Sequence, residues 1–175
     1  MKRVSFLTWI FSLALFSSEF QRGKYLLHGS AGELIYFLQD PTTKIQNAAL
    51  VQVGFEYLLC PQWSIGAALR PLFAADRFGM GLAANAKYRF LNQTSDFVPF
   101  VGLGIIPSVL VPTNLYGTVH FDLGVRPSTG FEYGLMPDLA FYVETAVIPN
   151  LLFGTGTIRN LEVSFELLAG ITWRL

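Results

Sequence analysis

The chain has 175 residues, of which 52% are hydrophobic and only 14% are charged, and its mean hydropathy of +0.44 is high for a water-soluble protein. The length suggests a single domain. Its 12 basic and 12 acidic residues cancel, which argues against nucleic acid or an anionic surface as the partner.

The first residues resemble an export signal. Met1-Lys2-Arg3 precede an uncharged run from Val4 to Ser18. A short cationic stretch followed by an apolar stretch of this length is typical of a secretory signal and is too short for a membrane-spanning helix. We therefore expect a signal peptide at residues 1–20 and a mature domain at residues 21–175. An uncleaved anchor is the alternative, because the small-residue pattern of a cleavage site is poor.

The rest of the chain alternates between apolar and other residues with a period of two, which indicates β-strands. The expected strands are residues 25–38, 48–59, 63–73, 80–90, 97–110, 117–134, 138–148 and 160–175. Each is long enough for a tilted transmembrane strand of about ten residues. Connections alternate in length, and the two longer ones are residues 39–47 and 148–159.

The first strand breaks this pattern at Glu33. Tyr25 and Leu27 would lie on the apolar face, and Glu33 would then share that face with them. A β-bulge near Gly32 would shift the register. After such a bulge, Leu34 would face outward.

The uncharged stretch between Asp96 and Asp122 is the one place beyond the signal that is long enough for a helical membrane span. Three prolines and three glycines interrupt it. Proline and glycine disfavour a helix interior. We therefore expect strands here as well.

Alternation alone also fits a soluble sandwich or a lipocalin-like barrel whose apolar face points inward. The apolar face here is too bulky to be enclosed by eight strands, and glycines gather on the opposite face. Aromatic residues of the apolar face cluster near one end, as in an interfacial girdle. We therefore expect the apolar face to contact lipid and the polar face to line the lumen.

The inward face carries a nearly balanced set of charges, which we predict to form a network. Its members are Glu56, Arg70, Lys87, Arg89, Asp122, Arg126, Glu132, Glu144, Glu162, Glu166 and Arg174. Isolated charges in a lumen of low dielectric cost several kcal/mol each, so pairing across strands is expected. Adjacent strands and matched parity predict a pair between Glu56 and Arg70. The network predicts a plugged lumen.

Four segments in order along the chain resemble the OmpA/OmpX-like small outer-membrane β-barrel family. They are KYRF at 87–90, PFVGLG at 99–104, GFEYGLMPDL at 130–139 and GITWRL at 170–175. The ending also resembles the signal read by the barrel-assembly machinery, with Gly170, Trp173 and Leu175 at the matching positions, although an aromatic residue is usual at the last one. The resemblance implies an all-β, eight-stranded, antiparallel up-and-down transmembrane β-barrel in the outer membrane of a Gram-negative cell. Outer-membrane lipid and, during insertion, the assembly machinery would be its partners.

Function is less constrained than fold. We expect a structural or interaction role without enzymatic activity, and we expect no cofactor and no metal. One alternative is a narrow pore for small solutes. The other is a lipid-modifying enzyme, whose nucleophile, base and acid would come from five inward residues. These are Ser128 or Ser164, His120, and Glu132 or Asp122. The structural interpretation of both histidines, His28 and His120, is that they fill the lumen.

Overall fold

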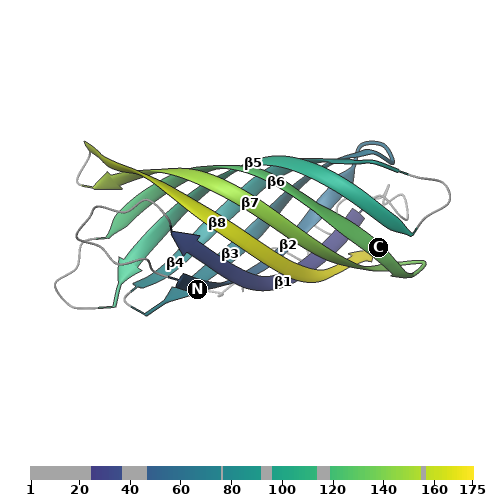
Figure 1. Ribbon diagram of the computed structural model, residues 1–175, viewed down its shortest axis with the longest axis horizontal. Coiled ribbons are helices and arrows are strands. Elements are labelled where there is room, and N and C mark those ends of the chain that lie inside the picture. Colours follow the sequence, from purple (N-terminus) through teal and green to yellow (C-terminus); the bar gives the residue numbers. More distant parts are fainter. Residues whose placement is uncertain (1–24, 37–46, 76, 92–95, 114–118, 155–156) are drawn as a thin grey trace, which may run out of the picture.

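The computed structural model describes residues 25–36, 47–75, 77–91, 96–113, 119–154 and 157–175. These residues form one closed barrel of eight antiparallel strands, in which each strand pairs with the next and the last pairs with the first (Figure 1). The expected eight-stranded antiparallel fold is therefore confirmed. The expected signal peptide lies outside the described residues. Among the described residues, no helix is long and apolar enough to cross a membrane.

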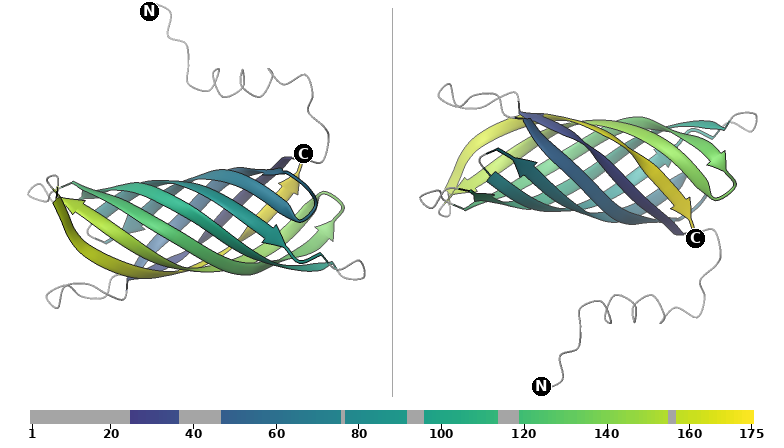
Figure 2. Two further views of the ribbon diagram at one scale, coloured as in Figure 1. Left: turned by 90° about the horizontal axis from the view of Figure 1, so that it is seen from above. Right: turned by 90° about the horizontal axis from the view of Figure 1, so that it is seen from below.

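The strand boundaries lie within three residues of the expected ones, except at the end of the seventh strand. They are β1 Tyr25–Tyr36, β2 Asn47–Leu58, β3 Trp63–Ala74, β4 Arg77–Arg89, β5 Phe97–Pro112, β6 His120–Met136, β7 Leu139–Gly154 and β8 Thr157–Arg174. All strands run obliquely around the barrel (Figure 2). The barrel closes between β1 and β8, where the N–H of Leu175 also donates to the carbonyl of Tyr25 at 2.9 Å. We call the end that holds Tyr25 and Leu175 the terminal end, and the opposite end the far end.

Side chains alternate between the two faces of the sheet, as the sequence pattern predicts. On β2, Val53 and Phe55 point outward and are 54% and 57% exposed, whereas Gln52 and Glu56 point inward and are 4% and 2% exposed. On this strand the charged residue is thus enclosed and these large apolar residues are outside. This confirms the expected direction of the faces.

The expected bulge in β1 is wrong. β1 pairs without a register shift with β2, from Tyr25–Tyr57 to Ile35–Asn47, and with β8. Leu34 therefore points inward and is buried, while Glu33 points outward and is exposed. An inward leucine is accommodated because the lumen is itself apolar at this height.

The expected long connection at residues 148–159 is also wrong. β7 continues to Gly154 and pairs with β8 beyond Pro149, which lies opposite Val163. Proline has no N–H group, so within a strand it needs a position where no backbone hydrogen bond has to be donated. Within the described strands, the β6–β7 register pairs stop at Gly124–Asn150 and resume at Ser128–Ala146. Pro149 lies in that gap, so it does not end the strand.

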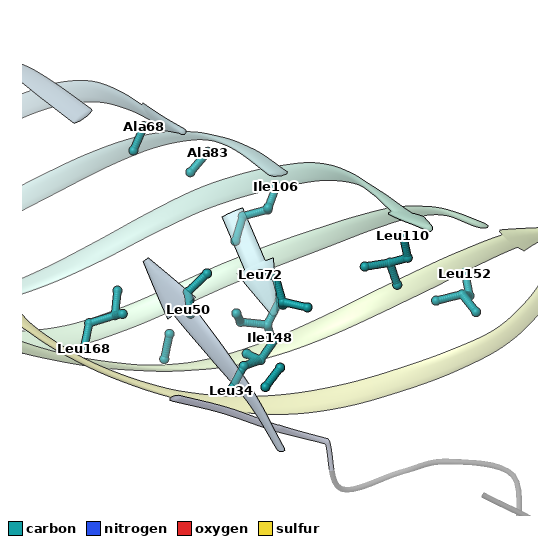
Figure 3. Packing of buried hydrophobic residues seen from close by; sticks show 12 residues of the cluster. Leu34, Leu50, Ala68, Leu72, Ala83, Ile106, Leu110, Ile148, Leu152 and Leu168 are labelled. Carbon is teal, nitrogen blue, oxygen red and sulfur yellow. The ribbon is translucent and has the colours of Figure 1, made fainter. Parts of the chain in front are cut away.

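An apolar cluster fills part of the barrel interior. Leu34, Leu50, Leu72, Ile106 and Ile148 come from five strands, and each is less than 10% exposed. Their side chains point toward one another inside the barrel (Figure 3). We call this cluster the apolar layer. The interior of the barrel is therefore filled by the apolar layer as well as by charged side chains.

Candidate functional site

The inward face of the barrel carries ionised side chains in two compact groups. The first charge cluster consists of Glu56 on β2, Lys87 and Arg89 on β4, and Glu132 on β6. Lys87 Nζ lies 2.7 Å from Glu56 Oε1 and 3.5 Å from Glu132 Oε1. Arg89 Nη2 lies 2.7 Å from Glu56 Oε2, and Arg89 Nε lies 2.9 Å from Glu132 Oε2. Each carboxylate of this cluster therefore faces both cations.

Ser64 completes the hydrogen bonding of the first charge cluster. Its hydroxyl donates to Glu56 Oε2 at 2.8 Å and accepts from Arg89 Nη1 at 2.8 Å. Ser64 is fully buried. Charge-assisted bonds of this kind offset the cost of taking ionised groups out of water. Ser64 was not among the residues predicted for the lumen network, although the alternation of β3 places it on the inward face.

The second charge cluster consists of Arg70 on β3, Arg126 on β6, Glu144 on β7 and Glu166 on β8. Arg126 Nη1 lies 2.8 Å from Glu144 Oε1, and Arg126 Nη2 lies 2.5 Å from Glu166 Oε1. Arg70 forms an ion pair with the other oxygen of Glu166. All four side chains are at most 4% exposed. The cluster joins strands from opposite sides of the barrel.

The predicted pair of Glu56 with Arg70 is wrong. Glu56 lies opposite Gly66 on β3, so Arg70 is four residues farther along that strand. At about 3.3 Å per residue this separates the two levels by roughly 13 Å along the strand. Matched parity places both residues in the lumen, but the hairpin register puts them in different clusters.

Aromatic side chains fill the space beside the charges. Among the side chains that the structure describes, Phe100 and Tyr142 are the two largest that are fully buried. Lys87 Nζ lies 4.4 Å from the centre of the Phe100 ring and 5.6 Å from that of Tyr142. His28 contacts Tyr142 edge-on, with 6.4 Å between ring centres. Cation–π contacts of a desolvated ammonium group add to its ion pairs. Phe100 and Tyr142 were not predicted to fill the lumen, because a large inward aromatic side chain conflicts with the glycine-rich inner face.

The remaining predicted network members lie outside both clusters. Arg174 is exposed, and it lines a cavity of about 830 Å³ at the terminal end. Arg89 and Glu132 also line this cavity. Asp122 and Glu162 are buried nearer the far end. From the terminal end to the far end, the inward charged residues of β6 are therefore Glu132, Arg126 and Asp122.

The residues of the terminal assembly signal have distinct surroundings. Gly170 points inward, and a Cβ there would overlap the backbone oxygen of Gly29 at the closing seam. Trp173 and Leu175 are exposed, by 54% and 48%. The first position therefore serves barrel closure, whereas the other two remain accessible.

The contacts of two of the groups considered for catalysis differ from those of a nucleophile and its base. Ser164 donates to the carbonyl of Ile148 at 3.4 Å and accepts from Asn150 Nδ2 at 3.1 Å. His120 Nδ1 has no hydrogen-bond partner. An active nucleophile needs a base within hydrogen-bond reach. Among the described residues, no group of three or more His, Cys, Asp and Glu side chains is placed to hold a metal ion.

Comparisons with known proteins point to one kind of fold. No protein-family model matches the chain, and no curated protein matches its sequence. Neisserial surface protein A has 17% identity and a TM-score of 0.67, over 87% of this chain and 97% of that one. The N-terminal β-barrel domain of Pseudomonas aeruginosa OprF has 14% identity and a TM-score of 0.58, over 87% and 100%. The outer membrane enzyme PagL has 9% identity and a TM-score of 0.51, over 86% and 99%.

These identities are low, so the likeness concerns the fold. The similar structures are small outer-membrane barrels, and they include both an enzyme and proteins described without an activity. The fold therefore leaves the activity of this chain open.

Proposed function

We propose that this chain is an integral outer-membrane β-barrel with a structural or interaction role and a plugged lumen. The single observation that carries the proposal is the inverted distribution of side chains. Large apolar residues such as Leu103 and Leu161 are 60% and 61% exposed, whereas Glu144 and Glu166 are 2% and 0% exposed. In water this arrangement would be costly. A hydrocarbon solvent makes it favourable.

Aromatic pairs at both ends of the barrel support a membrane location. At the terminal end, the rings of Tyr25 and Tyr57 lie 5.1 Å apart, and those of Trp63 and Tyr88 lie 5.0 Å apart. At the far end, two pairs of rings lie 5.3 Å and 6.0 Å apart. They are Phe73 with Phe78 and Phe121 with Phe153. Two such girdles bound the apolar band of transmembrane barrels. We assign the terminal end to the periplasm.

Location is tested by cell fractionation followed by a heat-modifiability gel. We expect the chain in the outer-membrane fraction, as a band whose mobility shifts on boiling, because a closed barrel resists detergent until heated. Recovery in the soluble or inner-membrane fraction would refute the proposal. In the outer membrane, lipid would contact the outward face, and the assembly machinery would recognise Gly170, Trp173 and Leu175.

A plugged lumen is supported by three successive obstacles to solute flow. The first and second charge clusters cross the barrel interior, and the apolar layer follows them toward the far end. Apolar constrictions exclude water as well as ions. In planar bilayers we therefore expect no stepwise conductance from the purified protein. Uniform conductance steps would instead favour the narrow pore.

We also propose a non-enzymatic role. Ser164 is hydrogen-bonded within its own strand pair, and its inward position faces away from the lipid that a lipid-modifying enzyme would attack. An assay on lipid A and on phospholipids should show no turnover. Turnover by the wild type that His120→Ala abolishes would support the enzyme alternative.

Glu33 offers an independent test of the lipid-facing surface. It is the one acidic side chain on the outward face of β1, between Ala49 of β2 and Leu167 of β8. A charge facing lipid is unfavourable, less so for glutamate and near the interface than for a cation at mid-depth. In vesicles, Glu33→Leu is expected to raise the free energy of unfolding by about 1 kcal/mol. Destabilisation by this substitution would place Glu33 in water.

A further inference from the structure

A row of four inward residues crosses the barrel wall beside the apolar layer, one from each of β3 to β6. Arg70 of β3 lies opposite Gly81 of β4. Gly81 lies opposite Ser108 of β5, which in turn lies opposite Asp122 of β6. We call these four residues the polar row. It has a cationic side chain at one end and a carboxyl group at the other, with a glycine and a serine between them.

The hydrogen bonding at both ends of the polar row is incomplete. Arg70 pairs with Glu166 through Nη2, but its Nε has no hydrogen-bond partner among the described residues. Asp122 accepts hydrogen bonds from Ser108 and from the N–H of Leu123, whereas no described residue donates to its Oδ1. Arg70 and Asp122 are only 4% and 7% exposed. A buried donor and a buried acceptor without partners are costly, so each end calls for a further polar group.

Arg70 and Asp122 are too far apart to be that group for each other. Three steps between neighbouring strands separate them, and at about 4.8 Å per step this is roughly 14 Å along the sheet. A hydrogen bond spans only about 3 Å. The guanidinium group of Arg70 is also held by Glu166, which belongs to β8. More than one small molecule is therefore needed to reach both ends.

The polar row borders a space of suitable size. All four of its residues line one cavity of about 40 Å³. One water molecule requires roughly 10–15 Å³, so the cavity has room for more than one. Gly81 provides part of this room, because a Cβ added there would meet only side-chain carbons, the nearest being Ile106 Cγ2 at 3.3 Å.

We propose that this cavity binds a small cluster of water molecules, which donate to Asp122 Oδ1 at one end and accept from Arg70 Nε at the other. Water can both donate and accept, and the volume is too small for an organic ligand. Asn150 and Ser164 also line the cavity, but they are hydrogen-bonded to each other. A few bound waters do not form a continuous column through the lumen, so the absence of conductance is still expected.

The direct test is nuclear magnetic resonance of the folded barrel in detergent micelles, deuterated except at amide groups and isoleucine methyl groups. Long-lived water in the cavity should give through-space cross-peaks to the Gly81 amide proton and to the methyl groups of Ile106. Gly81→Ala places a methyl group in the cavity and should remove the cross-peaks to Ile106. Gly29→Ala is the matched control, because no atom lies within 4 Å of the Cβ it adds, and it should leave them unchanged.

Unfolding by urea gives an independent readout with opposite signs for a wet and a dry cavity. Displacing water that satisfies buried groups should lower the urea midpoint of Gly81→Ala. Filling an empty cavity and replacing a strand glycine should raise it. The heat-modifiability gel shows whether this variant folds, and the measurement on the wild type does not depend on it.

Three results would overturn the water site. The first is a wild-type protein without water cross-peaks at Gly81 and Ile106. The second is a Gly81→Ala variant with a higher urea midpoint than the wild type. The third is a shift of the Ile106 methyl resonances when xenon is added to the wild type, because xenon enters dry apolar cavities.

Discussion

Glu166→Gln is expected to lower the free energy of unfolding by about 3–5 kcal/mol, because it breaks a buried ion pair from one side only. Glu166 is fully buried and is the carboxylate shared by Arg70 and Arg126. Without its charge, Arg126 keeps Glu144 while Arg70 loses the carboxylate it is paired with. The measurement is equilibrium unfolding by urea in lipid vesicles, followed by tryptophan fluorescence.

A double-mutant cycle separates lost charge from lost packing. Arg70→Met combined with Glu166→Gln removes one charge of each sign, so the double variant should be more stable than the sum of the two single losses implies. Glu33→Gln changes a carboxylate on the outer surface and serves as the control, with an expected change below about 1 kcal/mol. If Glu166→Gln unfolds at the same urea concentration as the wild type, the second charge cluster does not stabilise the barrel.

Gly32→Ala is expected to cost about 3 kcal/mol or more, because the added methyl group has no space at the closing seam. A Cβ on Gly32 would overlap the backbone oxygen of Leu167 and would lie 2.9 Å from the Cα of Leu168. Both atoms belong to the backbone of β8, so no side-chain rotation relieves the contact. β1 and β8 would have to separate.

Gly29→Ala is the matched control, since it adds the same methyl group to the same strand. At Gly29, which faces outward, no atom lies within 4 Å of the added Cβ. We expect a change below about 0.5 kcal/mol, as for a substitution without packing consequences. The readout is the fraction of heat-modifiable barrel after folding into vesicles. Equal folding of the two variants would mean that the seam is wider than the structure shows.

The closed eight-stranded barrel could be predicted from the sequence because alternation is a local property. In β8, Leu161, Val163 and Phe165 alternate with Glu162 and Glu166, and no long-range information is needed to assign them to opposite faces. The low content of charge and the bulk of the apolar face then predicted which face points outward. That direction follows from the number of side chains a narrow barrel can hold.

Two departures came from features whose meaning depends on a neighbouring strand. Glu33 suggested a bulge, but β1 is held in register on both edges, and the apolar layer accepts Leu34. Pro149 suggested a loop, but it lies where the β6–β7 pairing is interrupted. A single strand carries no information about the register of its partners, so neither outcome could be derived from it.

The sequence by itself determined the strand number, the inward set of charges and the apolar outer surface, because each depends on the period-two repeat and on composition. Only the tertiary structure decided which charges meet: Glu56 joins Lys87 and Arg89, Arg70 joins Glu166, and Asp122 and Glu162 are left without a full set of partners. The physical reason is that ion pairs form across the lumen between residues at the same height. That height is fixed by the tilt and register of all eight strands together.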